Sequence, residues 1–336
     1  MLLLAFAPQL TAARVPLLQN ISYKPELDDG DCLTARAAGW GLGSQLIHLL
    51  HAMVHVGSQR LWWDFAESPY HCCGQEPGPG RGAPCDRWHT LFAGRLPQLS
   101  PPDPEHNFTD AVSSIFVDET GTRRDCVRWA ALHVASFNRA RFNRTTTCAR
   151  LCGPLNAIWQ FEPTSMQPIL DHELTFLMHA PKPLVVLQVR GGDKLGTEAP
   201  SYIDVDTPLQ RLSEQENAPT NGTCVLLGDD WELSLNASKS AQRWLGCTVV
   251  NRLQPGYTHF QGHFQVEPPA MRCFRARRLL VDIEIMAAAD ALVALMLSNV
   301  ARIAVLLREC RALGSGASST TDWLGRNVLD EACFPF

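Results

Sequence analysis

Residues 184–311 alternate short apolar runs with longer stretches whose apolar positions recur at helical spacing. Short apolar runs bounded by turn-forming residues are typical of buried strands. The expected strands cover residues 184–189, 224–227, 248–250 and 291–295, and the expected helices cover residues 208–216, 233–244, 275–288 and 298–311. Strands that alternate with helices in this way indicate an α/β fold, in which a parallel sheet carries helices on both faces.

The part of the chain before residue 181 follows a less regular pattern. Residues 39–45 read GWGLGSQ, a glycine turn that opens a predicted helix with apolar residues three and four positions apart as far as Val54. Other expected elements are a strand at residues 60–65, helices at residues 126–143 and 164–179, and a disulfide-held surface loop at residues 68–107.

A Pro-Lys-Pro sequence at residues 181–183 should end the preceding helix, and we expect the boundary between two lobes there. A chain of 336 residues is about twice the size of a common domain. The predicted organisation is a leader at residues 1–31, which would be a signal or anchor remnant, an amino-terminal lobe at residues 32–180 and a Rossmann-like lobe at residues 181–336.

The charge balance argues against a protein that binds nucleic acid. The sequence contains 29 Lys and Arg residues against 34 Asp and Glu residues, which gives a formal net charge of -5. Proteins that bind nucleic acids or anionic membrane surfaces usually carry an excess of positive charge. An anionic ligand of this chain would therefore be held by a few placed cations.

The cysteines and the glycosylation motifs favour an oxidising compartment, the lumen of the ER or Golgi. The 12 cysteines lack the regular Cys-x-x-Cys pairs of zinc sites, and several lie in loops rich in Gly and Pro. Disulfides are the favoured interpretation, scattered structural thiols are the alternative, and the pairing stays open. Asn-x-Ser/Thr motifs occur at Asn20, Asn107, Asn143, Asn221 and Asn236.

No segment of the sequence has the character of a membrane span. Residues 1–7 are apolar, but Pro8 interrupts them and they have no basic start, so they resemble a fragment of a signal or anchor. The apolar stretch at residues 279–307 contains the charged residues Asp282, Glu284, Asp290 and Arg302. Because such charges are costly in lipid, we expect buried strand and helix there, and a membrane anchor only outside this chain.

The loop at residues 187–199 follows an expected strand and combines glycines with cations. Ligands of open α/β sheets bind beyond the carboxyl ends of the strands. The glycines would let backbone N–H groups approach a phosphate, Arg190 offers a planar fork for phosphate oxygens, and Lys194 adds a compact charge. The alternative is an ordinary glycine turn with solvated charges.

Other polar groups lie at or near the ends of expected strands. Asp229 and Asp230 could orient a hydroxyl or a base edge, or they could cap the next helix. Asp282, which is surrounded by apolar residues, needs partners such as arginines or the N–H donors of guanine. Ser298 and Asn299 open a predicted helix whose free N–H groups suit a diphosphate, although a plain helix cap is the alternative.

The histidines do not predict a metal site. His48, His51 and His55 fall on one face of a predicted helix, but no acidic or cysteine partner lies nearby at ligand spacing. His259 and His263 form a second pair that we do not assign to a metal. An amphipathic or buried helix is the favoured interpretation of the first group, and we predict no metal.

Taken together, these motifs resemble the α1,6-fucosyltransferase family, which modifies N-glycan cores and has bacterial chitooligosaccharide relatives. The donor motif of that family, HVRRxDKxGTE, corresponds to QVRGGDKLGTE at residues 188–198. Its later segments LDIH, ADFLV and SSQVxR correspond to VDIE at residues 281–284, ADALV at residues 289–293 and LSNVAR at residues 297–302. A GxGxGxQ helix opening is similar to residues 39–45, and order and spacing agree over most of residues 39–330.

The resemblance implies a GT-B-like fold of two Rossmann-like lobes, with the acceptor side in residues 32–180 and the GDP-sugar site in residues 181–336. It implies an inverting, α1,6-type transfer of fucose from GDP-β-L-fucose to a glycan or glycoprotein acceptor, without metal or cofactor. Arg190 would hold the β-phosphate, and Glu198, with Lys194 beside it, would take the proton of the acceptor hydroxyl. The implied donor-binding residues are Gln188, Asp193, Asp229, Asp230, Asp282, Ser298 and Asn299, with Asp282 on guanine and Ser298-Asn299 at the diphosphate.

The chain departs from the family motif at Gln188, where the family has His, and at Gly191, where it has a second Arg. Loss of one phosphate-binding guanidinium would cost about 2–4 kcal/mol of transition-state stabilisation, by analogy with single oxyanion-hole donors. Two alternatives therefore stay open. One is a catalytically impaired relative that binds a donor or a glycan, and the other is a protein O-fucosyltransferase, since that related family shares the donor loop and fold.

Overall fold

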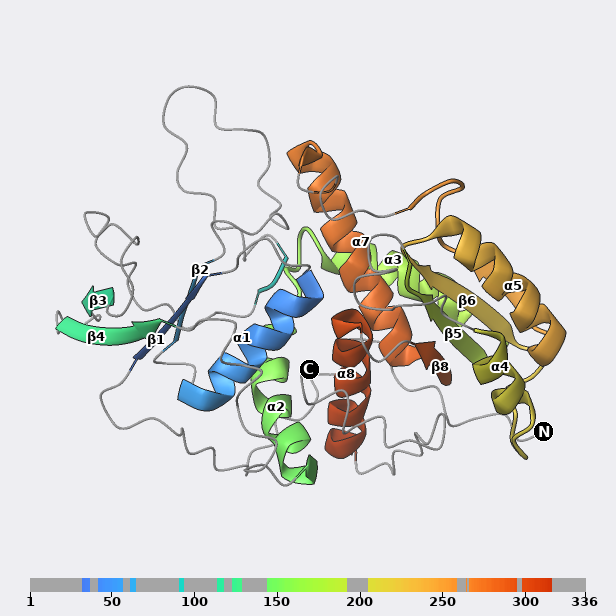
Figure 1. The fold of residues 1–336 in the computed structure, drawn as a ribbon, viewed down its shortest axis with the longest axis horizontal. Helices are drawn as coiled ribbons and strands as arrows, with labels where there is room; N and C mark the ends of the chain where they lie inside the picture. Colours follow the sequence, from blue (N-terminus) through green and yellow to red (C-terminus); the bar gives the residue numbers. More distant parts are fainter. Residues whose placement is uncertain are drawn as a thin grey trace.

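A computed structural model contains the parallel sheet expected in the second half of the chain (Figure 1). Strands β5 (Leu184–Val189), β6 (Thr223–Gly228), β7 (Thr248–Asn251) and β8 (Ala291–Ala294) are all parallel and pair in the order β7-β6-β5-β8. The predicted α/β class is confirmed. The structure describes residues 32–36, 42–56, 61–64, 91–93, 114–117, 123–128, 144–191, 205–258, 264, 266–294 and 298–315.

The central strand β5 is apolar at nearly every position because both of its faces are covered. Leu184 and Val186 belong to one hydrophobic cluster, and Val185 and Leu187 belong to a second cluster on the opposite face. All positions of the strand are buried. A parallel strand between two helical layers gains from apolar side chains on both faces, so the run is continuous and not alternating.

Two helical layers enclose this sheet. Helices α4 (Asp206–Ser213) and α5 (Trp231–Leu245) cover one face, and α7 (Pro269–Ala288) and α8 (Asn299–Ser315) lie on the other side (Figure 1). These helices confirm the expected alternation. The only large difference in position is the start of α7, which begins at Pro269 and not near Arg275, because proline is favoured in the first turn of a helix.

A second sheet lies at the opposite end of the molecule (Figure 1). Strands β1 (Cys32–Arg36), β2 (Leu61–Asp64), β3 (Ser114–Val117) and β4 (Arg123–Arg128) pair in the order β2-β1-β4-β3, with β1 parallel to both of its neighbours and β3 antiparallel to β4. The helix expected from residue 126 is therefore wrong for residues 126–128, which are strand. Pairing with the distant β1 overrides the local pattern there.

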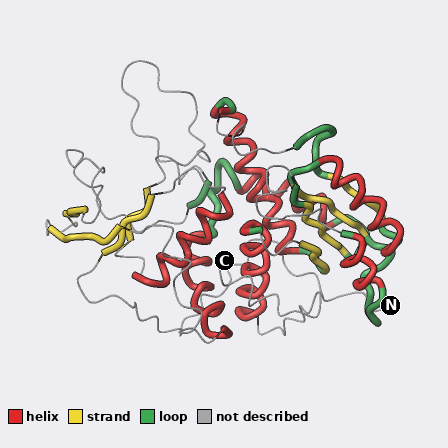
Figure 2. Tube along the Cα trace, viewed as in Figure 1, coloured by secondary structure: helices red, strands yellow, loops and turns green. Residues whose placement is uncertain are grey.

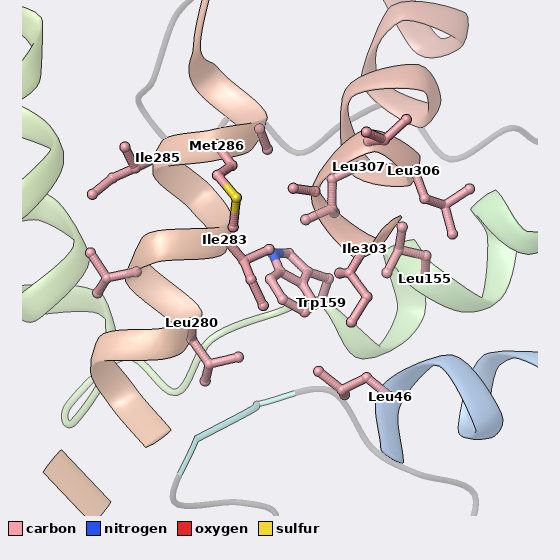
Figure 3. Packing of buried hydrophobic residues seen from close by; sticks show 14 of the residues in the cluster. Leu46, Leu155, Trp159, Leu280, Ile283, Ile285, Met286, Ile303, Leu306 and Leu307 are labelled. Carbon is pink, nitrogen blue, oxygen red and sulfur yellow. The ribbon is translucent and has the colours of Figure 1, made fainter. Parts of the chain in front are cut away.

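Helices occupy the space between the two sheets, as Figure 2 shows by colour. Helices α1 (Leu42–Val56), α2 (Arg144–Ile158) and α3 (Gln167–Met178) share one hydrophobic cluster with α7 and α8. The predicted helix at residues 164–179 is confirmed as α3, whereas α2 was not predicted. Figure 3 shows this packing, in which Leu46, Leu155 and Ile303 from different helices surround the ring of Trp159.

Trp159 also anchors a buried acidic group within this cluster. Its Nε1–H donates to Glu284 Oε1 at 2.5 Å, and the Arg311 guanidinium donates to both oxygens of the same carboxylate at 2.8 and 2.9 Å. Glu284 is 6% exposed. A buried carboxylate is tolerated only when it is paired and hydrogen-bonded, so this contact set has a structural role.

Disulfides join distant parts of the chain, as the cysteine content predicted. Cys152 in α2 bonds Cys310 in α8, and Cys224 in β6 bonds Cys247. Cys273 is also disulfide-bonded, and the described residues include no free cysteine. This usage agrees with an oxidising compartment.

Several sequence predictions fall outside the described residues. They include the leader at residues 1–31 and, apart from residues 91–93, the loop at residues 68–107. Within the part of the chain that the structure describes, no helix combines the length and the apolar character needed to cross a membrane.

Candidate functional site

The strand order places a topological switch point between β5 and β8. From β5 the chain moves outward through β6 to β7, and it then returns to place β8 on the other side of β5. Ligands of open α/β sheets bind at such a point, in the crevice beyond the carboxyl ends of the strands. Gln188, near the end of β5, and Ser298, at the start of α8, were both predicted as donor-binding residues and meet here.

Gln188 is a buried amide with one satisfied and one unsatisfied end. Its Nε2 donates to Ser298 Oγ at 2.9 Å, and the two residues are 8% and 5% exposed. Its Oε1 is buried and has no hydrogen-bond partner in the structure. A buried carbonyl without a donor costs about 1–3 kcal/mol, so this oxygen is a natural acceptor for a ligand group.

Ser298 holds the capping position of α8. Its carbonyl accepts the first helical hydrogen bond, from the Arg302 N–H at 3.1 Å. The N–H groups of the first helical turn have no partners within a helix, and the helix dipole makes this end positive. The switch point therefore carries a helix amino terminus that suits an anion.

Asn299 is engaged between two helices. Its Nδ2 donates to Ser44 Oγ of α1 at 2.8 Å, and its Oδ1 accepts from the Arg302 guanidinium at 3.1 Å. A Cβ atom at Gly43 would lie 3.0 Å from Val300 Cγ2, so the glycine allows α1 to approach α8 closely. Gly43 and Ser44 of the GWGLGSQ motif thus allow the first helix to pack against the amino terminus of α8.

Arg190 is paired with Asp229 at the adjacent strand ends. Arg190 Nη1 forms an ion pair with Asp229 Oδ2, and the Gly191 N–H donates to Asp229 Oδ1 at 2.6 Å. The side chains of Arg190 and Asp229 are 22% and 11% exposed. The structure therefore brings together two predicted site residues, one cation and one anion, and their charges offset each other.

Gly191 has no room for a side chain in this arrangement. An added Cβ would lie 2.6 Å from Leu233 Cδ1 and 2.7 Å from Asp230 Cβ. Both contacts come from the start of α5. The family's second arginine could be accommodated here only if α5 or the loop moved.

Asp230 acts as the cap of α5. Its Oδ1 accepts from the Leu233 N–H at 3.0 Å, and its backbone is extended, as expected for a residue that precedes a helix. This geometry matches the capping alternative for the Asp229-Asp230 pair. Asp229 and Asp230 thus have different roles although they are adjacent.

Asp282 lies within helix α7 and not at the end of a strand, and it belongs to a separate charged cluster with Arg252 and Glu173. Arg252, which directly follows β7, donates from Nε to Asp282 Oδ1 at 3.2 Å and from Nη1 to Glu173 Oε2 at 2.6 Å. Burial raises the pKa of Asp282, while the charges of Arg252 and Arg278 act in the opposite direction. The arginine partner that the sequence required for this buried acid is therefore present.

The remaining predicted site residues lie outside the described part of the chain. Asp193, Lys194 and Glu198 fall within residues 192–200. The predicted roles of Lys194 and Glu198 in catalysis therefore stay predictions. Among the described residues, no group of His, Cys, Asp and Glu side chains has the geometry to hold a metal ion.

Sequence reasoning missed Ser44, Arg252 and Tyr257. Arg252 lies just beyond the strand predicted at residues 248–250, so the rule that selected Asp229 could have found it. Ser44 lay in a recognised motif, but its contact with α8 depends on tertiary packing. The ring of Tyr257 lies 4.5 Å from the Arg275 guanidinium. Burial raises the pKa of Tyr257, and the nearby Asp229 charge adds to that rise. No sequence signal distinguishes this tyrosine.

Comparison with known proteins adds no family to these observations. No model of a known protein family matches the chain, and no curated protein matches it. Inference about function therefore depends on the order of the motifs and on the side chains at the carboxyl ends of β5, β6 and β8.

Proposed function

We propose that the chain binds GDP-fucose across the carboxyl ends of β5 and β8 and transfers fucose to a glycan hydroxyl. The observation that carries this proposal is the meeting of Gln188 and Ser298, which are 110 residues apart, beside the amino terminus of α8. A GT-B arrangement of two Rossmann-like lobes and a location in the Golgi or ER lumen are parts of the same proposal.

The phosphate groups of the donor would face α8 and Arg190. The first turn of α8 supplies N–H donors and a positive dipole, and Arg190 supplies a fork that matches phosphate oxygens. Gln188 contacts Ser298 at the start of α8 and carries an acceptor oxygen that a sugar hydroxyl could meet. A leaving diphosphate would gain stabilisation from these groups as its negative charge develops.

The guanine base would extend toward Arg252 and Asp282. Arg252 follows β7, which is two strands from β5, and strands are spaced by about 4.8 Å. Strands β7 and β5 are thus separated by about 10 Å across the sheet, a distance that a nucleotide can span from base to phosphate. Asp282 is the carboxylate that could accept from guanine N–H donors, in exchange for part of its contact with Arg252.

The acceptor chemistry would come from the loop after β5. By the family resemblance, Glu198 removes the proton of the attacking hydroxyl and Lys194 lies beside it. The hydroxyl oxygen then bonds to the anomeric carbon as the bond to GDP breaks, through a centre with oxocarbenium character. Attack from the face opposite the leaving group inverts that carbon.

A binding protein without turnover is the second candidate, and two contacts favour it. Arg190 is neutralised by Asp229, and Gly191 leaves no space for the second arginine of the family motif. A relative with this loop could hold a donor or a glycan without stabilising the transition state. This candidate predicts ligand binding with no transfer.

GDP release in the presence of GDP-fucose and glycan acceptors separates these candidates. We expect wild-type protein to release GDP, and Arg190→Ala to reduce kcat/KM by at least about a hundredfold, as for loss of one oxyanion-hole donor. Arg243→Ala is the matched control, because Arg243 pairs with Asp206 on helices α5 and α4 at 3.7 Å and lies outside the site. Binding of GDP with no release would favour the second candidate.

The position of the transferred fucose separates a glycan enzyme from a protein O-fucosyltransferase. Mass spectrometry of the products should locate fucose on N-acetylglucosamine if the acceptor is an N-glycan core or a chitooligosaccharide. Fucose on Ser or Thr side chains of a folded acceptor protein would instead favour the O-fucosyltransferase alternative.

A further inference from the structure

We infer that Asp229 sets the affinity of this site for diphosphates, because its carboxylate and a bound diphosphate compete for the guanidinium of Arg190. This inference rests on the proposed function, since it takes the ligand of the site to be a nucleoside diphosphate. It assigns Asp229 a role that differs from direct contact with the donor: the residue lowers the affinity for the ligand that Arg190 binds.

The contacts of Asp229 show how the competition arises. One carboxylate oxygen pairs with Arg190, and the other accepts from the Gly191 N–H at 2.6 Å. The Asp229 N–H in turn donates to the Val189 carbonyl at 3.3 Å. Asp229 is thus bound to three consecutive residues at the end of β5, and it holds Arg190 beside the strand.

The strength of the pair follows from its burial. The side chains of Arg190 and Asp229 are 22% and 11% exposed, so solvent screens them less than a surface pair. A phosphate that binds Arg190 must compete with the Asp229 oxygen that pairs with Arg190 Nη1. The intrinsic attraction between Arg190 and a diphosphate is therefore reduced by the loss of the Asp229 contact.

The surroundings do not allow a second cation at the adjacent position. A Cβ atom at Gly191 would lie 2.6 Å from Leu233 Cδ1 and 2.7 Å from Asp230 Cβ, so the loop cannot compensate with a side chain there. The other groups described at the switch point, which are Gln188, Ser298 and the start of α8, carry no formal charge that could offset Asp229. Removal of the Asp229 charge should therefore have a large effect on anion binding.

The substitution Asp229→Asn isolates this charge from the hydrogen bonds. An asparagine can keep its Oδ1 as acceptor for the Gly191 N–H, while its Nδ2 replaces the oxygen that neutralises Arg190. The backbone contact stays and the ion pair is lost. Gain of affinity is a useful readout, because damage to the fold would weaken binding and not strengthen it.

Calorimetric titration with GDP and with inorganic pyrophosphate tests the inference on the full chain. Asp229→Asn should bind both ligands at least about tenfold more tightly than wild type, a change of about 1.4 kcal/mol. The gain should disappear in the double variant Asp229→Asn/Arg190→Ala. Asp206→Asn is the matched control, because it removes an aspartate that pairs with Arg243, at the opposite end of α5 from Asp230. The affinity of this variant for both ligands should equal that of wild type.

Unchanged or weaker binding by folded Asp229→Asn would overturn the inference. Asp229→Ser, which removes the charge from a smaller side chain, provides a second variant, and thermal unfolding establishes that each variant is folded. Loss of folding in both variants would also contradict the inference, because it would assign Asp229 to stability.

Fucose transfer is assayed separately, so the two proposals can fail independently. Tighter binding without transfer by either protein would retain the role of Asp229 and reject the enzyme. Fucose transfer by wild type without tighter binding by Asp229→Asn would retain the enzyme and reject the role of Asp229.

Discussion

Gly191 occupies a position where the local packing restricts the residue type. The contacts that a side chain would meet come from Leu233 and Asp230 at the beginning of α5. Asp230 is fixed there as the cap of that helix, with its Oδ1 3.0 Å from the Leu233 N. An arginine at this position, as in the fucosyltransferase motif that the loop resembles, would therefore strain the helix start before it could add a useful charge.

Gly191→Arg should destabilise the fold by about 1–3 kcal/mol, the usual cost of overpacking, and should not raise transferase activity. Urea unfolding measures the stability and GDP release measures the activity. Gly153→Arg is the control, because an added Cβ at Gly153 meets no atom within 4 Å. Higher activity of Gly191→Arg with unchanged stability would contradict this expectation.

Asp282 should give the stability of the protein a recognisable pH dependence. Burial raises its pKa in the folded state, so the folded protein holds a proton that the unfolded chain releases. The contribution of this group to stability is therefore fully present below the unfolded pKa of about 4 and declines as pH rises through the folded pKa. As pH rises through the folded pKa, the stability of Asp282→Asn should therefore increase relative to that of wild type. Urea unfolding at each pH measures this difference.

Asp206→Asn supplies the opposite pH dependence as a control. Hydrogen bonds from Ser240 and Trp244 lower the pKa of the Asp206 carboxyl. Its contribution is present above the unfolded pKa and is lost as pH falls through the folded pKa. If the stability difference from wild type changed with pH in the same direction for Asp282→Asn and Asp206→Asn, the proposed effect of Asp282 burial would be rejected.

At the scale of residues, position along a strand was the useful predictor. Gln188 and Ser298 come together because Gln188 lies near the carboxyl end of β5 and Ser298 opens the helix that follows the neighbouring strand β8. The pairing of Arg190 with Asp229 could not be predicted, since both residues were selected as ligand contacts and their mutual distance depends on side-chain conformation. The contact of Asn299 with Ser44 joins residues 255 positions apart and has no local signal.

At the scale of elements, the Cys152–Cys310 disulfide connects α2 to the helix that begins at the candidate site. The variant Cys152→Ala/Cys310→Ala should lose about 2–5 kcal/mol of stability, because the crosslink no longer restricts the unfolded chain. Its sequence separation is 158 residues, against 23 for Cys224–Cys247. Removal of Cys224–Cys247 should therefore cost less stability than removal of Cys152–Cys310. Chemical denaturation of both double variants measures the two losses, and a larger loss for Cys224–Cys247 would contradict the expectation.

The two sheets differ in how well sequence predicts them. Strands β5 to β8 are short apolar runs separated by helices, so pattern and pairing agree. In the first sheet only β2 had a clear signal. The β4 sequence RRDCVR has no apolar alternation, and its strand conformation depends on pairing with β1 and β3.

At the scale of the molecule, the main hydrophobic cluster crosses the boundary predicted at residues 181–183. Leu46 of α1 and Leu155 of α2 pack with Leu280 of α7 and Ile303 of α8 (Figure 3). The sequence could not reveal that these helices share one core. The pattern of each helix indicates an apolar face but does not indicate which helix covers that face.

A fragment of residues 181–336 should therefore fail to unfold cooperatively. It would expose the faces of α7 and α8 that α1 and α2 cover in the full chain. Calorimetry of the purified fragment, with the full chain as reference, measures this. A single cooperative transition in the fragment would instead support a lobe that folds independently.

The same disulfide also determines how a mechanical load would pass through the chain. A pull on the two ends would pass from Cys152 directly to Cys310 through the covalent crosslink. The parallel sheet, with Gln188 and Arg190 at the carboxyl end of β5, lies within the segment that this crosslink bypasses. Reduction of the Cys152–Cys310 bond would release the bypassed segment to extend, at about 3.3–3.6 Å for each residue.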